Sequence, residues 1–488
     1  MSRHHTGAEV RADIDHPIID ADGHWIEYTP VFAEQIRKAA GAKAEAGFRA
    51  SQARLPELLS LSIAERKRRG LAQDGYWARS TTNTVDRATS MLPRMIYDRL
   101  EEFGIDFGIV YPTAGLGVPR IPDGETRRAT CRGYNIVSAD YFAKLGDRLT
   151  PVMAIPTHTP DEAIAELEFV VRELGAKVCM LASGIPRPLA ATAGTDPELA
   201  RFAVRYDQLG LDSDHDYDPV WEKCRELGVA PTFHTGGRGF GLRASPSNYT
   251  FNHIGHFAEA GQAVAKALFL GGVTRRFPEL NFAFLEGGAG WACQLFADLT
   301  EHWERRNKAG IAYNDPMKLD RTLLKTLIDR YGYEDIAAEV ARRDGWPNLD
   351  EDLLTGGDTV LDDFALCGIT RKEDWVELFA KRFYFGCEAD DRMNAVPFGR
   401  ANPFGARLNA MFSTDNGHFD VQDMRKPAAE AWGLVEDGLL TEDDFRDFAF
   451  ANAVRLWGTQ NPHFFEGTAV AGAAAAVLAA APARAAAE

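Results

Sequence analysis

Short runs of apolar residues alternate along the chain with longer segments whose apolar positions have a helical spacing. Runs rich in Val, Ile, Phe and Leu without a polar face are typical of strands buried on both sides of a parallel sheet. Eight such runs are predicted as strands, at residues 17–23, 105–113, 149–156, 176–183, 229–236, 280–288, 382–388 and 408–415. Helices are predicted between strands, for example at 159–175, where Thr159 or Asp161 can cap the start and Gly175 the end, and at 218–228.

Eight strands that alternate with helices predict an α/β fold, a (β/α)8 TIM-like barrel, over residues 17–468. Two spacers, about 31–103 and about 300–381, are too long for plain crossover helices and are predicted as mostly helical insertions. Residues 1–16 are an N-terminal extension. Residues 469–488 form an Ala-rich low-complexity tail, which is predicted to be a frayed extension.

Composition narrows the choice of partners. The 488 residues include 71 Asp and Glu against 54 Lys and Arg, a formal charge of −17, which disfavours binding to nucleic acid or to anionic lipid. The N-terminus has no apolar core of a signal peptide or membrane anchor, and the 6 cysteines have no paired spacing. We therefore expect a cytoplasmic protein with reduced thiols, without nucleic acid or membrane partners.

Polar side chains stand where several predicted strands end. Asp22 and His24 are two residues apart in the first strand, so both can point to one side. His234 ends the fifth strand, Glu286 the sixth and Asp415 the eighth. The strand ends of a barrel meet at one mouth, so these groups are predicted to converge. Imidazole nitrogen and carboxylate oxygen suit Zn²⁺ first, with Mn²⁺ or Fe²⁺ as alternatives, so a divalent metal site is predicted.

Each residue taken alone also has a structural explanation. A histidine at a strand end is often a hydrogen-bonded structural residue. Asp415 can cap a following helix, and Glu286 before two glycines can belong to a turn. The metal site is inferred from the combination of four strand ends rather than from any one of them.

These residues give the chain a resemblance to a known family. The chain resembles the amidohydrolase-related (amidohydrolase 2) metal-dependent hydrolases, in the branch that includes aminocarboxymuconate semialdehyde decarboxylase. The resemblance extends over about 17–468 and implies a homo-oligomer. It rests on Asp22 and His24, on His234, on Glu286 within FLEGGAGW, and on Asp415 with His418 within STDNGHFD.

The resemblance also implies roles for individual residues. The implied metal ligands are Asp22, His24, His234, Glu286 and Asp415. Many relatives carry a histidine where this chain has Glu286, so His256, Asp415 and Glu286 are the candidate catalytic residues. His256 is three residues after His253, a spacing that predicts neighbouring positions on one helical turn. Arg238, in a glycine-rich loop, and His418 are expected to contact the substrate.

The function predicted first is that of a metal-dependent hydrolase, which acts on a small organic substrate through a metal-activated water. Three alternatives stay open. They are a metal-dependent decarboxylase of an aromatic or unsaturated carboxylic acid, a non-haem di-iron oxygenase on the same fold, and a barrel that binds a ligand without catalysis.

Overall fold

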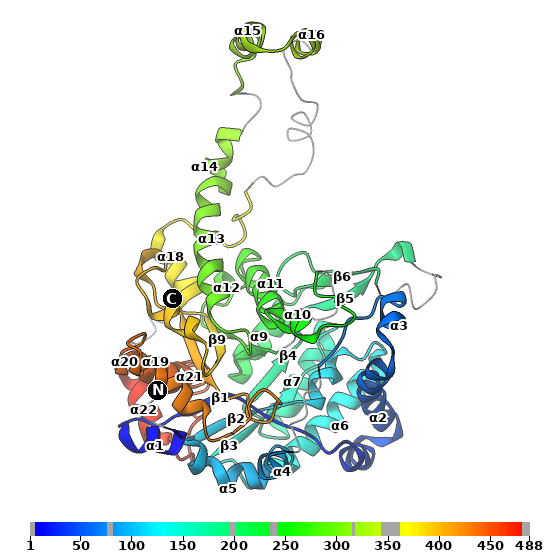
Figure 1. Cartoon of the computed structure of the whole chain (residues 1–488), viewed down its shortest axis with the longest axis vertical. Helices are drawn as coiled ribbons and strands as arrows, with labels where there is room; N and C mark the ends of the chain where they lie inside the picture. The colour runs from blue at the N-terminus through cyan, green and yellow to red at the C-terminus, as the bar shows by residue number, and fades with distance from the viewer. Residues whose placement is uncertain are drawn as a thin grey trace.

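Parallel strands form the centre of the molecule (Figure 1). The computed structural model describes residues 5–75, 82–192, 194, 202–234, 236, 242–314, 318–342 and 362–480. In this part of the chain eight parallel strands pair in the order β1-β2-β3-β4-β7-β8-β9-β10. They are β1 Ile19–Trp25, β2 Phe107–Pro112, β3 Leu149–Ala154, β4 Val178–Leu181, β7 Pro231–Phe233, β8 Phe282–Phe284, β9 Phe383–Glu388 and β10 Asn409–Ser413. Each overlaps one of the eight predicted runs, so the predicted (β/α)8 barrel is confirmed.

Helices connect the strands and cover the barrel. The first group in the chain is α1 Gly7–Asp13, α2 Thr29–Ser60, α3 Ile63–Arg68, α4 Thr84–Thr89, α5 Pro93–Phe103, α6 Gly124–Phe142, α7 Pro160–Arg172 and α9 Asp218–Leu227. The second is α10 Tyr249–His253, α11 His256–Leu270, α12 Val273–Arg276, α13 Gly290–Arg306, α14 Lys308–Ile311, α15 Arg321–Tyr331 and α16 Glu334–Arg342. The last is α18 Lys372–Trp375, α19 Pro427–Glu436, α20 Glu442–Arg446, α21 Asn452–Gly458 and α22 Ala471–Ala480.

The predicted helix starts have a local cause. Thr159 accepts a hydrogen bond from the backbone of Glu162, whose side chain in turn accepts one from the Thr159 backbone, so a capping box begins α7. The helix α9 ends at Gly228, which takes the left-handed conformation.

The strands are apolar because both of their faces are covered. Phe233, Phe284 and Phe385 are register partners on β7, β8 and β9, and their rings stack with centroids 5.6 Å and 6.0 Å apart. Trp291 of α13 packs edge-on against Phe284 and Phe385. A strand covered on both faces needs no polar alternation, which is why continuous apolar runs predict these strands.

The ring closes between β1 and β10 through the residues that follow β10. The backbone N–H of His24 donates to the carbonyl of Asn416 at 2.8 Å, and that of Asp415 donates to the carbonyl of Asp22 at 3.1 Å. The buried carboxylate of Asp20 accepts from the backbone N–H of Thr414 at 3.0 Å and from its hydroxyl at 2.5 Å. A side chain therefore completes the seam, and the same seam positions Asp22, His24 and Asp415.

The two predicted insertions are mostly helical where the structure describes them. The first contains α2 to α5, and α2 packs on α6 through Phe32, whose ring centroid is 5.2 Å from that of Tyr134. The second contains the end of α13, then α14, α15, α16 and α18. A hairpin of β5 (Ile185–Pro188) and β6 (Val204–Asp207) between β4 and α9 was not predicted.

The tail differs from its prediction. A frayed extension was expected from residue 469, but residues 471–480 form α22, in which Ala474 and Val477 are buried. Leu478 lies against Gly458 of α21, where an added Cβ would be 2.8 Å from Leu478 Cδ1. Alanine has the highest helix propensity and its small side chain permits close packing. Among the described residues, no helix is long and apolar enough to cross a membrane.

Candidate metal centre

The end of β1 supplies two candidate ligands, Asp22 and His24, both buried. A β-bulge interrupts the pairing of β1 with β2 between Asp20 and Gly23. Asp20 lies before the bulge and bonds to the seam, whereas the candidate ligands Asp22 and His24 come after Asp20. The Nδ1 atom of His24 is 3.2 Å from the carbonyl oxygen of Pro112. A carbonyl can only accept, so Nδ1 carries the proton and Nε2 keeps its lone pair for a ligand.

His234 and Glu286 complete the first cluster of donor atoms. Nε2 of His234 lies 3.0 Å from Nε2 of His24, 3.3 Å from Asp22 Oδ1 and 3.2 Å from Glu286 Oε2. The four side chains are buried, and each offers a donor atom within 4.8 Å of the others. The structure thus brings together four of the five predicted ligands at one point.

Asp415, the fifth predicted ligand, belongs to an overlapping cluster with His24, Glu286 and His418. Its Oδ1 atom is 3.7 Å from His24 Nε2 and 2.7 Å from His418 Nδ1. Nε2 of His418 is 3.1 Å from the hydroxyl oxygen of Thr113, and its ring stacks on that of His24 with centroids 4.0 Å apart. Two adjacent groups of donors therefore share His24 and Glu286.

Two of these residues have an unusual backbone. Glu286 has φ 59° and Asp415 has φ 49°, in the left-handed region that disfavours side chains with a Cβ. Such conformations cost free energy and persist where the surrounding structure holds them. Here the unfavourable turn directs both carboxylates into the cluster at the ends of β8 and β10.

The donor set fits a divalent cation. Asp415 Oδ2 is buried and has no hydrogen-bond partner in the described structure. Buried charged oxygens without partners are costly, and a bound cation would compensate them. Two imidazoles and three carboxylates match the N/O ligands that Mn²⁺, Fe²⁺ and Zn²⁺ take in proteins.

The protonation states agree with this fit. Burial lowers the pKa of His24, so the imidazole is neutral, as a metal ligand must be. Burial raises the pKa of Asp22, but the neighbouring imidazoles, His234 more than His24, outweigh it and hold the pKa at about 2. Burial, followed by the charges of Glu286 and Asp420, raises the pKa of Asp415. The surplus of carboxylates there is the reason that the cluster favours a proton or a cation.

The chain matches the model of one protein family. The model of the amidohydrolase family matches residues 19–336, about two thirds of the chain, and this stretch contains Asp22, His24, His234 and Glu286. The chain belongs to the amidohydrolase family. Members of this family are enzymes, so the chain is identified as an enzyme. A comparison with curated proteins finds no significant match.

Solved structures of an amidohydrolase and of two decarboxylases are similar to this chain at low sequence identity. An amidohydrolase of Mycobacterium avium subsp. paratuberculosis is 15% identical, with 91% of this chain and 98% of that chain covered and a TM-score of 0.52. A dihydroxybenzoic acid decarboxylase of Polaromonas, with bound manganese and the inhibitor 2-nitroresorcinol, is 16% identical, with 92% and 99% covered and a TM-score of 0.50. The 2,6-dihydroxybenzoate decarboxylase of Rhizobium is 16% identical, with 91% and 98% covered and a TM-score of 0.45.

His256 belongs to neither of the two groups of donor atoms. It begins α11, whereas His253 ends α10, so the two histidines are on separate helices with ring centroids 4.9 Å apart. The expectation of one helical turn is therefore wrong, because Gly255 between them is in the left-handed conformation. The ring of Phe257 packs against the rings of His256 and His234, with centroids 3.9 Å and 5.3 Å apart.

Arg238, predicted to contact the substrate, lies outside the described residues. Two acids at the mouth were not among the predicted site residues. Glu388, at the end of β9, is exposed, and the partial burial of its carboxyl, followed by the charges of Asp420 and other acidic neighbours, raises its pKa to about 7. Asp420 ends the motif STDNGHFD, and its charge also raises the pKa of Asp415. Both residues are acids close to the end of a predicted strand, and this position was the feature of the sequence that could have indicated them.

Proposed function

We propose that the chain is a metal-dependent carboxy-lyase that removes CO₂ from a small aromatic or unsaturated carboxylic acid. The observation that carries the proposal is the convergence of Asp22, His24, His234 and Glu286 on one buried point at the barrel mouth. The fold shared with the manganese-bound dihydroxybenzoic acid decarboxylase of Polaromonas supports this reaction above hydrolysis.

The donor set favours manganese, or iron, over the zinc that the sequence suggested first. Three carboxylates, those of Asp22, Glu286 and Asp415, accompany two imidazoles, and such oxygen-rich sets suit Mn²⁺ better than a four-coordinate Zn²⁺. When bound, the ion supplies positive charge that holds the substrate carboxylate and polarises it. Without such a charge the acids at the mouth would repel an anionic substrate.

The side chains around the cluster have distinct tasks in this proposal. The Pro112 carbonyl fixes the tautomer of His24, and Thr113 holds His418 against Asp415. Glu388, with a pKa of about 7, is partly protonated at neutral pH and is the candidate proton donor. Its proton goes to the substrate carbon that bears the carboxylate. The bond to that carboxylate then breaks, its electron pair stays on the substrate, and CO₂ leaves.

Hydrolysis is the second candidate, and His256 favours it. This imidazole is buried, and a Cβ built on Gly236, two residues after His234, would lie 1.9 Å from its Nδ1 atom. An imidazole at that place is suited to accept a proton from water.

A substrate screen separates the two reactions. Protein loaded with manganese, iron or zinc is incubated with hydroxybenzoates and unsaturated diacids, with CO₂ measured, and with esters, amides and lactones, with acid release measured. Release of CO₂ that is lost in His24→Ala and kept in His302→Ala, an exposed histidine of α13, supports the proposal. Acid release without CO₂ would replace it with hydrolysis, and CO₂ release unchanged by His24→Ala would refute the role of the cluster.

A further inference from the structure

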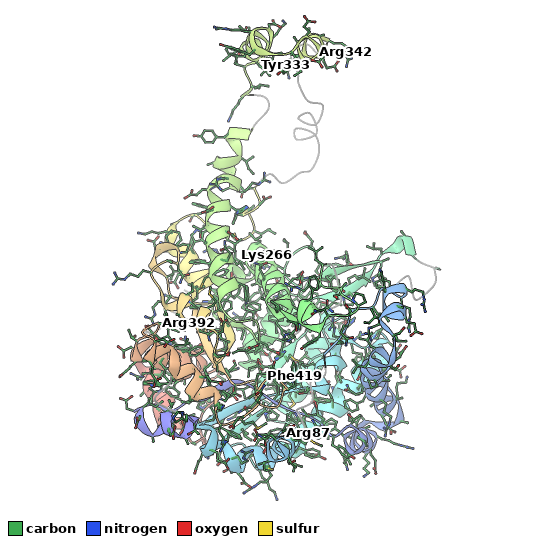
Figure 2. All side chains as sticks on the ribbon, in the orientation of Figure 1. Arg87, Lys266, Tyr333, Arg342, Arg392 and Phe419 are labelled. Carbon is green, nitrogen blue, oxygen red and sulfur yellow. The ribbon has the colours of Figure 1, made fainter. Side chains whose placement is uncertain are left out.

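Two helices of the second insertion extend away from the barrel. Figure 1 shows α15 and α16 beyond α14, at the far end of the molecule, and Figure 2 labels Tyr333 and Arg342 there. We call α15 and α16, with Asp320 before them and the turn between them, the arm. It is a helical hairpin whose two helices contact each other.

Local interactions determine where the helices of the arm begin and end. The side chain of Asp320 accepts from the backbone N–H of Leu323 at 2.8 Å and so caps α15. Lys325 pairs with Asp329 at 2.5 Å, one turn further along the same helix. The backbone of Gly332 ends α15 by donating to the carbonyl of Ile328 at 2.7 Å.

The arm leaves an apolar stripe on its surface. Leu323, Leu327 and Tyr331 are spaced four residues apart on α15 and are 54%, 44% and 69% exposed. Ile336 on α16 is 47% exposed. No residue of α15 is buried within the part of the chain that the structure describes. Helices of 11 and 9 residues are marginal in water without tertiary packing. An exposed apolar stripe of this kind indicates a surface that binds a partner.

The charges of the two helices are complementary. α15 carries three cations and one anion, Arg321, Lys325, Arg330 and Asp329, which gives 3 − 1 = +2. α16 carries one cation and three anions, Arg342, Glu334, Asp335 and Glu339, which gives 1 − 3 = −2. Within one arm the two helices already place opposite charges against each other. A partner surface that covers the arm fits best if it adds acidic groups beside α15, basic groups beside α16 and apolar side chains over the stripe.

The arm of a second copy satisfies all three conditions. Around a twofold axis α15 of one chain faces α16 of the other, and this contact is made twice because each chain uses the same patch. We propose that the arm is a dimerisation element, in which the two arms pack into a four-helix arrangement. The apolar stripes are then covered, and opposite charges select the pairing of α15 with α16.

Two charge-reversed variants test this pairing. Lys325→Glu with Arg330→Glu changes α15 from +2 to −2, and Glu334→Lys with Asp335→Lys changes α16 from −2 to +2. Each variant alone places like charges in both contacts of a homodimer, and also between the two helices of its own arm. A mixture of the two restores opposite charges in both contacts. The matched control is Lys144→Glu with Lys266→Glu, which makes the same change of charge at exposed lysines of the barrel.

The mass of the full chain is measured by sedimentation equilibrium at micromolar concentrations and 0.15 M salt. We expect a dimer for the wild-type chain and the control, a dimer dissociation constant raised by about 100-fold or more in each variant, and a heterodimer in the mixture. Leu323→Asp with Leu327→Asp should also give monomers, and circular dichroism should show an intact barrel in all. A monomeric wild-type chain, dimers that persist in the variants, or a mixture that stays monomeric would each overturn the proposal.

Discussion

Thr414 is expected to hold together the seam that positions the metal centre. Its hydroxyl donates to the buried carboxylate of Asp20 at 2.5 Å and accepts from the backbone N–H of Asn416 at 3.0 Å. Thr414→Val keeps the shape of the side chain but removes both bonds. It leaves Asp20 with one donor fewer and the N–H of Asn416 without its acceptor.

The magnitude follows from these two bonds. A hydrogen bond to a charged group contributes about 1.5–3 kcal/mol, and a buried N–H left without a partner costs about 1–3 kcal/mol, so Thr414→Val should destabilise the fold by about 2.5–6 kcal/mol. Thr414→Ser keeps the hydroxyl and loses one methyl group, which should cost about 1 kcal/mol. The difference between the two variants isolates the hydroxyl from the packing of the methyl group.

Two measurements check this prediction on metal-free protein at pH 8, where Asp20 is mostly ionised. Urea unfolding compares the midpoints of Thr414→Val, Thr414→Ser and wild type. Hydrogen exchange follows the amides of His24 and Asp415, which donate across the seam. We expect exchange about 100-fold faster or more in the valine variant, since 1.36 kcal/mol corresponds to tenfold. Equal midpoints and equal exchange in the valine and serine variants would refute the reasoning.

Three further outcomes are expected. Burial raises the pKa of Asp20 from 3.8 to about 7, so the folded state favours the protonated form. The unfolding free energy of wild type, measured relative to Asp20→Asn, should therefore fall as pH rises from about 4 to about 7. Chemical denaturation at several pH values checks this, and a difference between the two proteins that does not change with pH would contradict it. Gly236→Ala would place a Cβ 1.9 Å from His256 Nδ1, so kcat should fall about tenfold or more with metal content unchanged if His256 takes part, and unchanged kcat would exclude it. Gly417 has φ 124°, and a Cβ there would lie 2.5 Å from the carbonyl oxygen of His24. Gly417→Ala should therefore weaken metal binding about tenfold or more, measured by competition with a chelator. Wild-type affinity in this variant would show that the seam tolerates the shift.

The barrel could be predicted from the sequence because strands buried on both faces need continuous apolar runs. The candidate ligands could be predicted because barrel topology brings strand ends to one mouth. Asp22 and His24 were found as neighbours on one strand, while His234 and Glu286 join them only through the ring of strands. Contacts between distant parts of the chain are thus predictable where the topology dictates them.

Features that depend on three-dimensional packing were missed. Nothing in the sequence indicates that Asp20 bonds to Thr414 across the seam, since the two are 394 residues apart. The left-handed backbone of Glu286 and Asp415 also contradicts their local preference, and only the surrounding structure imposes it. The helix α22 was missed because its composition is of low complexity, although alanine favours a helix wherever a packing surface exists.

The most direct test of the proposed metal centre is the metal content of the full chain, purified without a metal-affinity tag. Inductively coupled plasma mass spectrometry is applied to wild type, His24→Ala, His234→Ala and the control His302→Ala. The account predicts about one equivalent of manganese or iron in wild type and the control, and its loss in the two cluster variants. Two equivalents of iron would favour oxygen chemistry at the two overlapping groups of donors instead. Metal retained in both cluster variants, or no metal bound by wild type after incubation with each ion, would contradict the account.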